Sequence, residues 1–265
     1  MRRMLPVTLR GLRDGWRGTL AWAVGLVAAL SLYLPLYPSF GTNGSLQDIM
    51  ASLPPELIDT LGYDQIGTGA GYAQATFFGL IGFALVVIAT TAWGAAVIGG
   101  AEESGRLELD LAHGIGRVSY TLQSALAIGI RLLFLGLVVG LTIGALNAPS
   151  ELELDAAHIA AATVALCGLG ALCASAGLLA GALTGRRVAG VAAGAGVAVY
   201  GYAVQAVANQ SEELTWVERL SPYAWAYSGA PLENGLTWGI AAVWGVSLAL
   251  LAAAALALRS RDVTG

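Results

Sequence analysis

Six long runs of apolar residues alternate with short polar segments along this chain. Each run matches or exceeds the ~20 residues that a helix needs to cross the hydrocarbon core of a bilayer. Their approximate bounds are 18–37, 72–100, 126–146, 156–183, 188–208 and 236–258. The ~10-residue alternating segments typical of a membrane β-barrel do not occur. The pattern predicts an all-α polytopic membrane protein, a single transmembrane domain over residues 1–265 with six transmembrane helices.

The first 17 residues predict a helix that lies in the membrane interface. Leu5, Leu9, Leu12 and Trp16 recur at three- and four-residue steps, so they share one helical face. Five arginines are interspersed among them, and such a face suits the phosphates of membrane lipid. The basic region of a signal peptide is the alternative, but the apolar run that follows is too long and lacks a clear cleavage site.

The composition fits a membrane protein and excludes several kinds of chemistry. Hydrophobic residues make up 57% of the chain and charged residues 11%, against about 25% charged in a soluble domain. The chain has no lysine, and all 13 basic residues are arginine. Neither a P-loop nor a Schiff base can form without lysine. We therefore expect no cofactor in this chain, and any ATP and Mg²⁺ that it uses must be bound by another chain.

The distribution of arginine predicts how the chain crosses the membrane. By the positive-inside rule, arginine-rich segments face the cytoplasm. The segments on one side of the predicted spans contain Arg2, Arg3, Arg10, Arg13, Arg17, Arg106, Arg117, Arg186, Arg187, Arg259 and Arg261. The opposite segments contain only Arg219. We therefore expect a multi-pass protein of the plasma membrane with both termini in the cytoplasm and with residues 38–71 and 209–235 outside the cell.

One cytoplasmic segment departs from the trend that acidic residues lie outside. Residues 101–117, here called the acidic segment, contain Glu102, Glu103, Glu108 and Asp110. Leu107 and Leu111 share a face at an i, i+4 spacing, and acidic residues near the start favour a helix N-terminus. Glycines at 105, 114 and 116 bracket a helix of about two turns. An acidic helix with apolar side chains is suited to a groove on a soluble partner, whereas the alternative is an ordinary solvated loop.

Arg131 is the one charged residue inside a predicted span. It could belong to a polar pathway through the membrane, because charges within spans often mark such pathways. Alternatively, its side chain could snorkel to the cytoplasmic interface, since it lies about 8 Å into the third span and helical side chains tilt toward the N-terminus. No Asp or Glu lies inside a span, which disfavours a proton-coupled transporter. No motif in the chain indicates an enzyme active site.

Taken in order, these segments resemble the permease subunits of type-2 ABC exporters. The stretch from Glu103 to Arg117, ESGRLELDLAHGIGR, resembles that family's cytoplasmic motif. The basic helix at 2–17 resembles the elbow helix before the first span. Leu220–Trp225, LSPYAW, resembles the Ser-Pro-aromatic segment before the last span, and Arg261-Asp262-Val263 resembles the Arg-Arg-Asp tail. His113-Gly114 departs from the family, in which many members have a small residue and proline.

The resemblance implies a mechanism. Two six-span permeases, identical or different, would pack about a two-fold axis, and each would dock a cytoplasmic ABC ATPase through a coupling helix after the second span. The expected contact comprises Glu102, Glu103, Arg106, Leu107, Glu108 and Leu111, with the acids facing basic residues of the ATPase. The substrate would be lipophilic, such as an antibiotic, drug or lipid, because the spans lack fixed acidic charges.

Two other functions remain open from the sequence. The chain could be a transporter or channel that works without ATP. It could also be a membrane scaffold or signalling subunit, in which residues 38–71 and 209–235 bind a ligand. No nucleic-acid partner is expected in any of the three cases.

Overall fold

The computed structural model describes residues 5–41, 67–210 and 212–261, and all regular structure in these ranges is helical. Most of the predicted extracellular segment 38–71 therefore lies outside the described residues. The helices of the first half are α1 (Pro6–Tyr33), η1 (Leu34–Leu36), α2 (Tyr37–Gly41), α5 (Gly69–Ala73), η3 (Gln74–Ile81), α6 (Gly82–Val97), α7 (Gly99–Glu103) and α8 (Arg106–Ala112). Those of the second half are α9 (Arg117–Asn147), α10 (Ala156–Thr184), α11 (Arg187–Ala208), η4 (Glu212–Leu220), α12 (Pro222–Tyr227), α13 (Pro231–Asn234) and α14 (Trp238–Ser260).

The prediction of six membrane-spanning helices is confirmed for the described residues. Six helical segments are long and apolar enough to cross a bilayer, and each overlaps one predicted run. They are Pro6–Ser39, Gly69–Val97, Arg117–Asn147, Ala156–Thr184, Arg187–Ala208 and Trp238–Ser260. The chain thus has the architecture of a multi-pass α-helical membrane protein.

Two helix boundaries differ from the sequence prediction. α1 runs without interruption from Pro6 to Tyr33, so no helix break separates the predicted interfacial helix from the first span. Likewise, the polar residues that precede the third predicted span belong to α9, which begins at Arg117. In both cases polar residues continue an apolar helix, because a change in polarity does not by itself interrupt backbone hydrogen bonding. Whether the first turns of α1 lie in the membrane interface stays a prediction.

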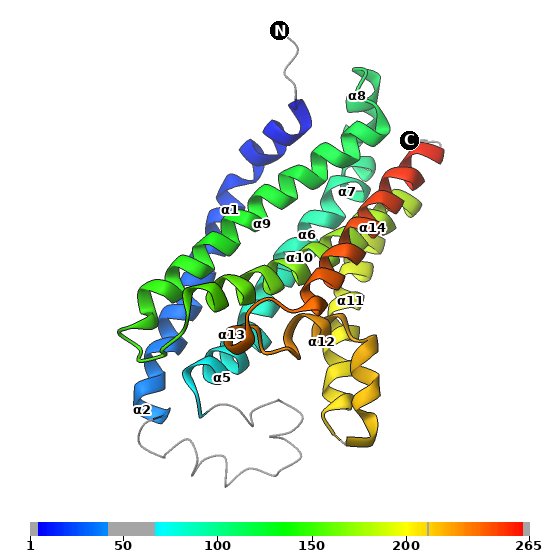
Figure 1. Ribbon diagram of the computed structural model, residues 1–265. Helices are drawn as coiled ribbons and strands as arrows, with labels where there is room; N and C mark the ends of the chain where they lie inside the picture. The colour runs from blue at the N-terminus through cyan, green and yellow to red at the C-terminus, as the bar shows by residue number, and fades with distance from the viewer. Residues whose placement is uncertain (1–4, 42–66, 211, 262–265) are drawn as a thin grey trace.

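α10 is the central helix of the bundle. In its most apolar window 83% of residues are buried, against 22–50% in the other five spans. It packs against α6, α9, α11 and α14, and α1 packs on the outside of α9 (Figure 1). The residues of α10 itself are largely apolar on every face of the helix, as expected for a helix enclosed by others.

Small residues bring α6, α10 and α11 into backbone contact. A Cβ added at Gly190 would lie 2.8 Å from the Cα of Ala95, and one at Gly194 would lie 2.8 Å from the carbonyl oxygen of Cys173. One added at Gly177 would lie 3.1 Å from the carbonyl oxygen of Gly190. Such close approach is how glycines promote helix association in membranes. These glycines therefore pack the helices of one chain.

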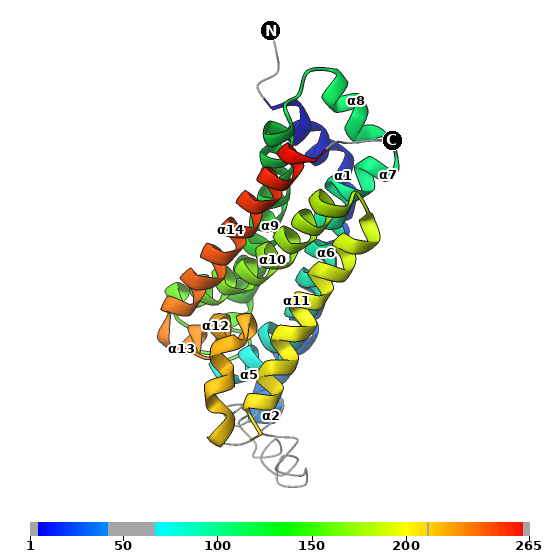
Figure 2. The same cartoon turned by 90° about the vertical axis from the view of Figure 1, so that its right-hand side faces the viewer.

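The two ends of the bundle differ in structure. The start of α1, the end of α14 and the helices α7 and α8 gather at one end, here called the α8 end (Figures 1 and 2). α2, α5, α12 and α13 lie at the other end (Figures 1 and 2).

The Ser-Pro-aromatic segment begins a helix at the end opposite α8. Ser221 accepts a hydrogen bond from the Ala224 N–H and donates one to the Gly201 carbonyl, and Pro222 occupies the first turn of α12. The Tyr223 hydroxyl donates to the carbonyl of Gly79 in the π-helical segment η3 over 2.8 Å. Burial raises the pKa of Tyr223, so its hydroxyl stays a neutral donor. The motif thus fastens α12 to α11 and to the second span.

Candidate functional site

The acidic segment folds into two short helices that project at one end of the bundle. α7 continues the direction of α6, and the chain then turns at Gly105 into α8 (Figure 2). Gly105 and Gly114 have φ values of +69° and +82°, a region in which only glycine is unstrained. The two glycines therefore set both ends of α8, a helix of two turns as the sequence predicts.

The predicted partner contact requires Leu107 to face outward, but in the structure Leu107 faces the interior of the protein. Its side chain is fully buried in a cluster that includes Val7 of α1, Ile98 before α7 and Tyr120 of α9. Leu111, one turn later, is half-buried against the same cluster. The sequence pattern correctly places the two leucines on one face of α8, but in the structure this face packs α8 against the rest of the same chain.

Asp110, which is not among the predicted contact residues, joins α8 to α1. Its Oδ1 accepts a hydrogen bond of 2.8 Å from Nη1 of Arg10, and its Oδ2 accepts a second from Nη2. Asp110 is only 8% exposed, whereas the Arg10 side chain is 48% exposed. Two parallel N–H···O bonds fix orientation as well as supplying charge attraction. Its position three residues after Leu107, on the same helical face, is the signal that could have indicated burial.

Two of the predicted contact acids, on α7, also bond within the chain. Glu102 forms an ion pair with Arg261, just after the end of α14, and both side chains are largely buried. Glu103 accepts a hydrogen bond of 2.8 Å from the backbone N–H of Arg187, at the start of α11. Glu102 is thus internal to the protein, while Glu103 remains an exposed residue with one oxygen engaged.

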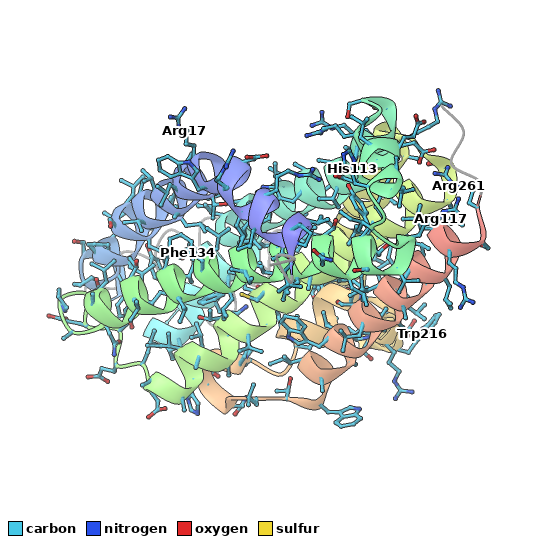
Figure 3. All side chains as sticks on the ribbon, turned by 90° about the horizontal axis from the view of Figure 1, so that it is seen from above. Arg17, His113, Arg117, Phe134, Trp216 and Arg261 are labelled. Carbon is cyan, nitrogen blue, oxygen red and sulfur yellow. The ribbon has the colours of Figure 1, made fainter. Side chains whose placement is uncertain are left out.

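The surface that α8 presents to solvent is mixed rather than acidic. It comprises the exposed residues Arg106, Leu109, Ala112 and His113, with Glu108 half-exposed at its edge, and is here called the α8 outer face (Figure 3). Leu109 is 61% exposed and is the large apolar side chain on this face. Of the predicted contact residues, Arg106 and Glu108 belong to this face and Glu103 lies exposed on α7, whereas Leu107 and Glu102 turn inward. Leu109 is not among the predicted contact residues.

Arg131 is held by α1 and α6. Its Nη2 donates a hydrogen bond to the carbonyl oxygen of Gly11, and its guanidinium lies 5.3 Å from the ring centroid of Trp93. Gly15 leaves the space, since a Cβ there would overlap the guanidinium. Gly11 lies in the second turn of α1, so the side chain extends toward the α8 end as the snorkelling interpretation expects. The aromatic ring and the carbonyl stabilise the cation inside the protein, while its buried Nε has no hydrogen-bond partner.

The described residues contain no group of three His, Cys, Asp or Glu side chains that could hold a metal ion. Cys167 and Cys173 are buried and separate thiols.

Neither a protein-family model nor a curated protein matches this chain.

Proposed function

We propose that this chain is the permease subunit of a type-2 ABC exporter and that α8 is its coupling helix. A separate ATPase would bind ATP and Mg²⁺ and dock on the α8 outer face from the cytoplasm. A second permease chain would complete the transporter in the plasma membrane. The cargo would be a lipophilic compound that leaves the cell.

The observation that carries this proposal is how α8 is fastened. A two-turn helix beyond a membrane bundle has too few backbone hydrogen bonds to be stable on its own. Here Leu107 is buried beneath it and Asp110 pairs with Arg10 of α1, while α7 is tied to Arg261 and Arg187. A helix held this firmly, with an exposed leucine on its free side, is suited to receiving force from a partner.

Two further observations support the same function. Many arginines belong to helix ends and turns at the α8 end, namely those at residues 10, 13, 106, 117, 186, 187, 259 and 261. The positive-inside rule assigns this end to the cytoplasm, where an ATPase would reside. In addition, Arg131 is engaged by Gly11 and Trp93, so its side chain is fixed by contacts within the chain. A structural role of this kind favours a permease for apolar cargo over a channel whose pathway would use this charge.

The proposal is tested by co-purification with the ATPase. The full-length chain is co-expressed with candidate ABC ATPases and extracted in mild detergent, and ATP hydrolysis by the co-purified ATPase is measured. We expect Leu109→Arg and Glu108→Arg to lower the co-purified ATPase activity at least tenfold, because both change the α8 outer face and neither side chain is buried. Leu220→Arg is the matched control, since Leu220 is 51% exposed at the other end of the bundle.

Two results would contradict the proposal. An ATPase that remains bound and active with Leu109→Arg and Glu108→Arg would exclude α8 as the docking helix. Transport of a lipophilic dye into liposomes by the chain alone, without any ATPase or ATP, would favour the ATP-independent transporter instead.

A further inference from the structure

A long apolar groove lies on the side of the bundle formed by α9 and α14. α10 forms its floor, and the groove has a volume of about 680 Å³. This volume falls within the ~300–1,000 Å³ typical of small-molecule sites. Residues that line it from the three helices include Leu126, Gly129, Leu133, Cys167, Leu248 and Leu251.

The groove is long enough to hold an extended hydrocarbon chain. Its lining residues on α9 run from Leu122 to Leu141, which corresponds to about 28 Å at 1.5 Å per residue. This length is close to the ~30 Å thickness of the hydrocarbon core of a bilayer. The hydroxyls of Thr163 and Ser247 donate to carbonyls of their own helices, and the indole N–H of Trp244 donates to the Val164 carbonyl. These groups are therefore satisfied, and the groove presents carbon to its occupant.

Two arginines flank the end of the groove nearest α8. Arg117 is the first residue of α9, and its Nη1 donates to the carbonyl oxygen of Arg259, near the end of α14, over 3.3 Å (Figure 3). Arg259 follows the lining residue Leu248 by eleven residues, which places it on a similar helical face about 17 Å further along. Within the part of the chain that the structure describes, neither guanidinium forms an ion pair. Two cationic residues that meet at one end of the groove without carboxylate partners attract an anion.

We propose that this groove binds one anionic phospholipid from the membrane leaflet at the α8 end. One acyl chain lies along α9 and α14, and the phosphate is bound by Arg117 and Arg259. The combination of an apolar groove with two arginines at one end matches a lipid with a charged head group, and arginine binds phosphate through paired N–H donors. A neutral lipophilic compound would leave both guanidinium groups without an anion.

The test measures lipid binding to the purified full-length chain by native mass spectrometry. The protein is stripped of lipid in detergent and titrated with phosphatidylglycerol and with phosphatidylcholine of the same acyl chains. We expect one phosphatidylglycerol to bind at least tenfold more tightly than phosphatidylcholine. Replacing both arginines, in Arg117→Gln/Arg259→Gln, should remove this preference while leaving weak binding of both lipids.

A second variant tests the groove separately from the charges. Gly129 lines the groove, and a Cβ at this position meets no atom within 4 Å, so the side chain of Gly129→Phe has room to begin at the groove surface and to occupy the groove. We expect it to lower the affinity for both lipids at least tenfold. Gly144→Phe is the control on the same helix, because a Cβ at Gly144 also meets no atom within 4 Å and Gly144 does not line the groove. The double variant Arg13→Gln/Arg17→Gln controls for loss of charge at exposed arginines of α1.

Three results would overturn the proposal. Equal binding of both lipids, unchanged by Arg117→Gln/Arg259→Gln, would show that the arginines do not select an anionic head group. Wild-type lipid affinity in Gly129→Phe would place the lipid elsewhere. Disulfide cross-linking between two copies at Leu133→Cys, abolished by Gly129→Phe, would show that another copy of the chain occupies the groove.

Discussion

The ion pair between Arg10 and Asp110 offers a direct test of how α8 is held. The proposed perturbation is a double-mutant cycle with Asp110→Asn, Arg10→Gln and the two changes combined. Asparagine and glutamine keep approximate size while removing charge, so the cycle isolates the coupling between the two groups. The two side chains come from positions 100 residues apart in the sequence, so their coupling reports the docking of α8 on α1.

The expected coupling follows from the burial of the two partners. Removing one partner of a fully buried pair costs about 3–5 kcal/mol, whereas an exposed pair contributes about 0–1 kcal/mol. Asp110 is 8% exposed, but the Arg10 side chain is 48% exposed and can be solvated when the carboxylate is gone. We therefore expect an intermediate coupling of about 1–2 kcal/mol. This corresponds to a roughly 5–30-fold change in the equilibrium between docked and undocked α8.

Hydrogen exchange of the peptide covering residues 106–116 measures this equilibrium in the detergent-solubilised protein. Local opening of α8 should accelerate exchange of its amides in each single variant, and the double variant should show little further acceleration. Arg13→Gln is the control, because Arg13 is 85% exposed and its contact with Asp14 spans 3.7 Å. Additive effects of the two single changes, with a coupling below ~0.3 kcal/mol, would refute the reasoning that this pair holds α8 in place.

Two further predictions concern side chains that join the bundle near α8. Leu107→Ala should destabilise the docking of α7 and α8 by about 2–5 kcal/mol, because Leu107 is fully buried. Leu109→Ala should change the free energy of docking by less than about 0.5 kcal/mol, because Leu109 is exposed. Hydrogen exchange of residues 99–116 distinguishes the two variants. Arg131→Gln should weaken the contact between α1 and α9 by about 1.5–3 kcal/mol through loss of the charged hydrogen bond to Gly11. Faster hydrogen exchange over residues 6–15 is the measurement. A loss of transport with no change in that exchange would instead favour a role for Arg131 in a pathway.

The sequence predicts the spans well because bilayer thickness sets their length. Each of the six helices is found where an apolar run predicts it, and α10 agrees with its predicted bounds to within one residue. Gly105 and Gly114 also mark the ends of α8 correctly, since a positive φ is a local property that glycine alone adopts without strain. Features fixed by chain length or by one residue's backbone are therefore predictable.

The direction in which α8 faces could not be predicted from its own residues. The spacing of Leu107 and Leu111 defines an apolar face, but a two-turn helix can turn that face inward or toward a partner with the same pattern. Its orientation depends on Tyr120 of α9 and on Val7 and Arg10 of α1, and Arg10 lies 100 residues before its partner Asp110. Because no local pattern encodes such tertiary contacts, the sequence alone could not show that Leu107 is buried against the bundle while Leu109 is exposed.

The contacts of the acidic segment determine where a force on α8 would go. Its covalent neighbours are α6 and α9, yet Asp110 connects it to α1, Glu102 to the end of α14 and Glu103 to the start of α11. Ion pairs and buried hydrogen bonds transmit displacement because their geometry tolerates little change in length. A partner that moves α8 would therefore act on α1, α11 and α14 together, as well as on the helices that flank it. Five of the six spans are thus reached from the acidic segment, and four of them, α6, α9, α11 and α14, pack directly on α10, the element against which they would move.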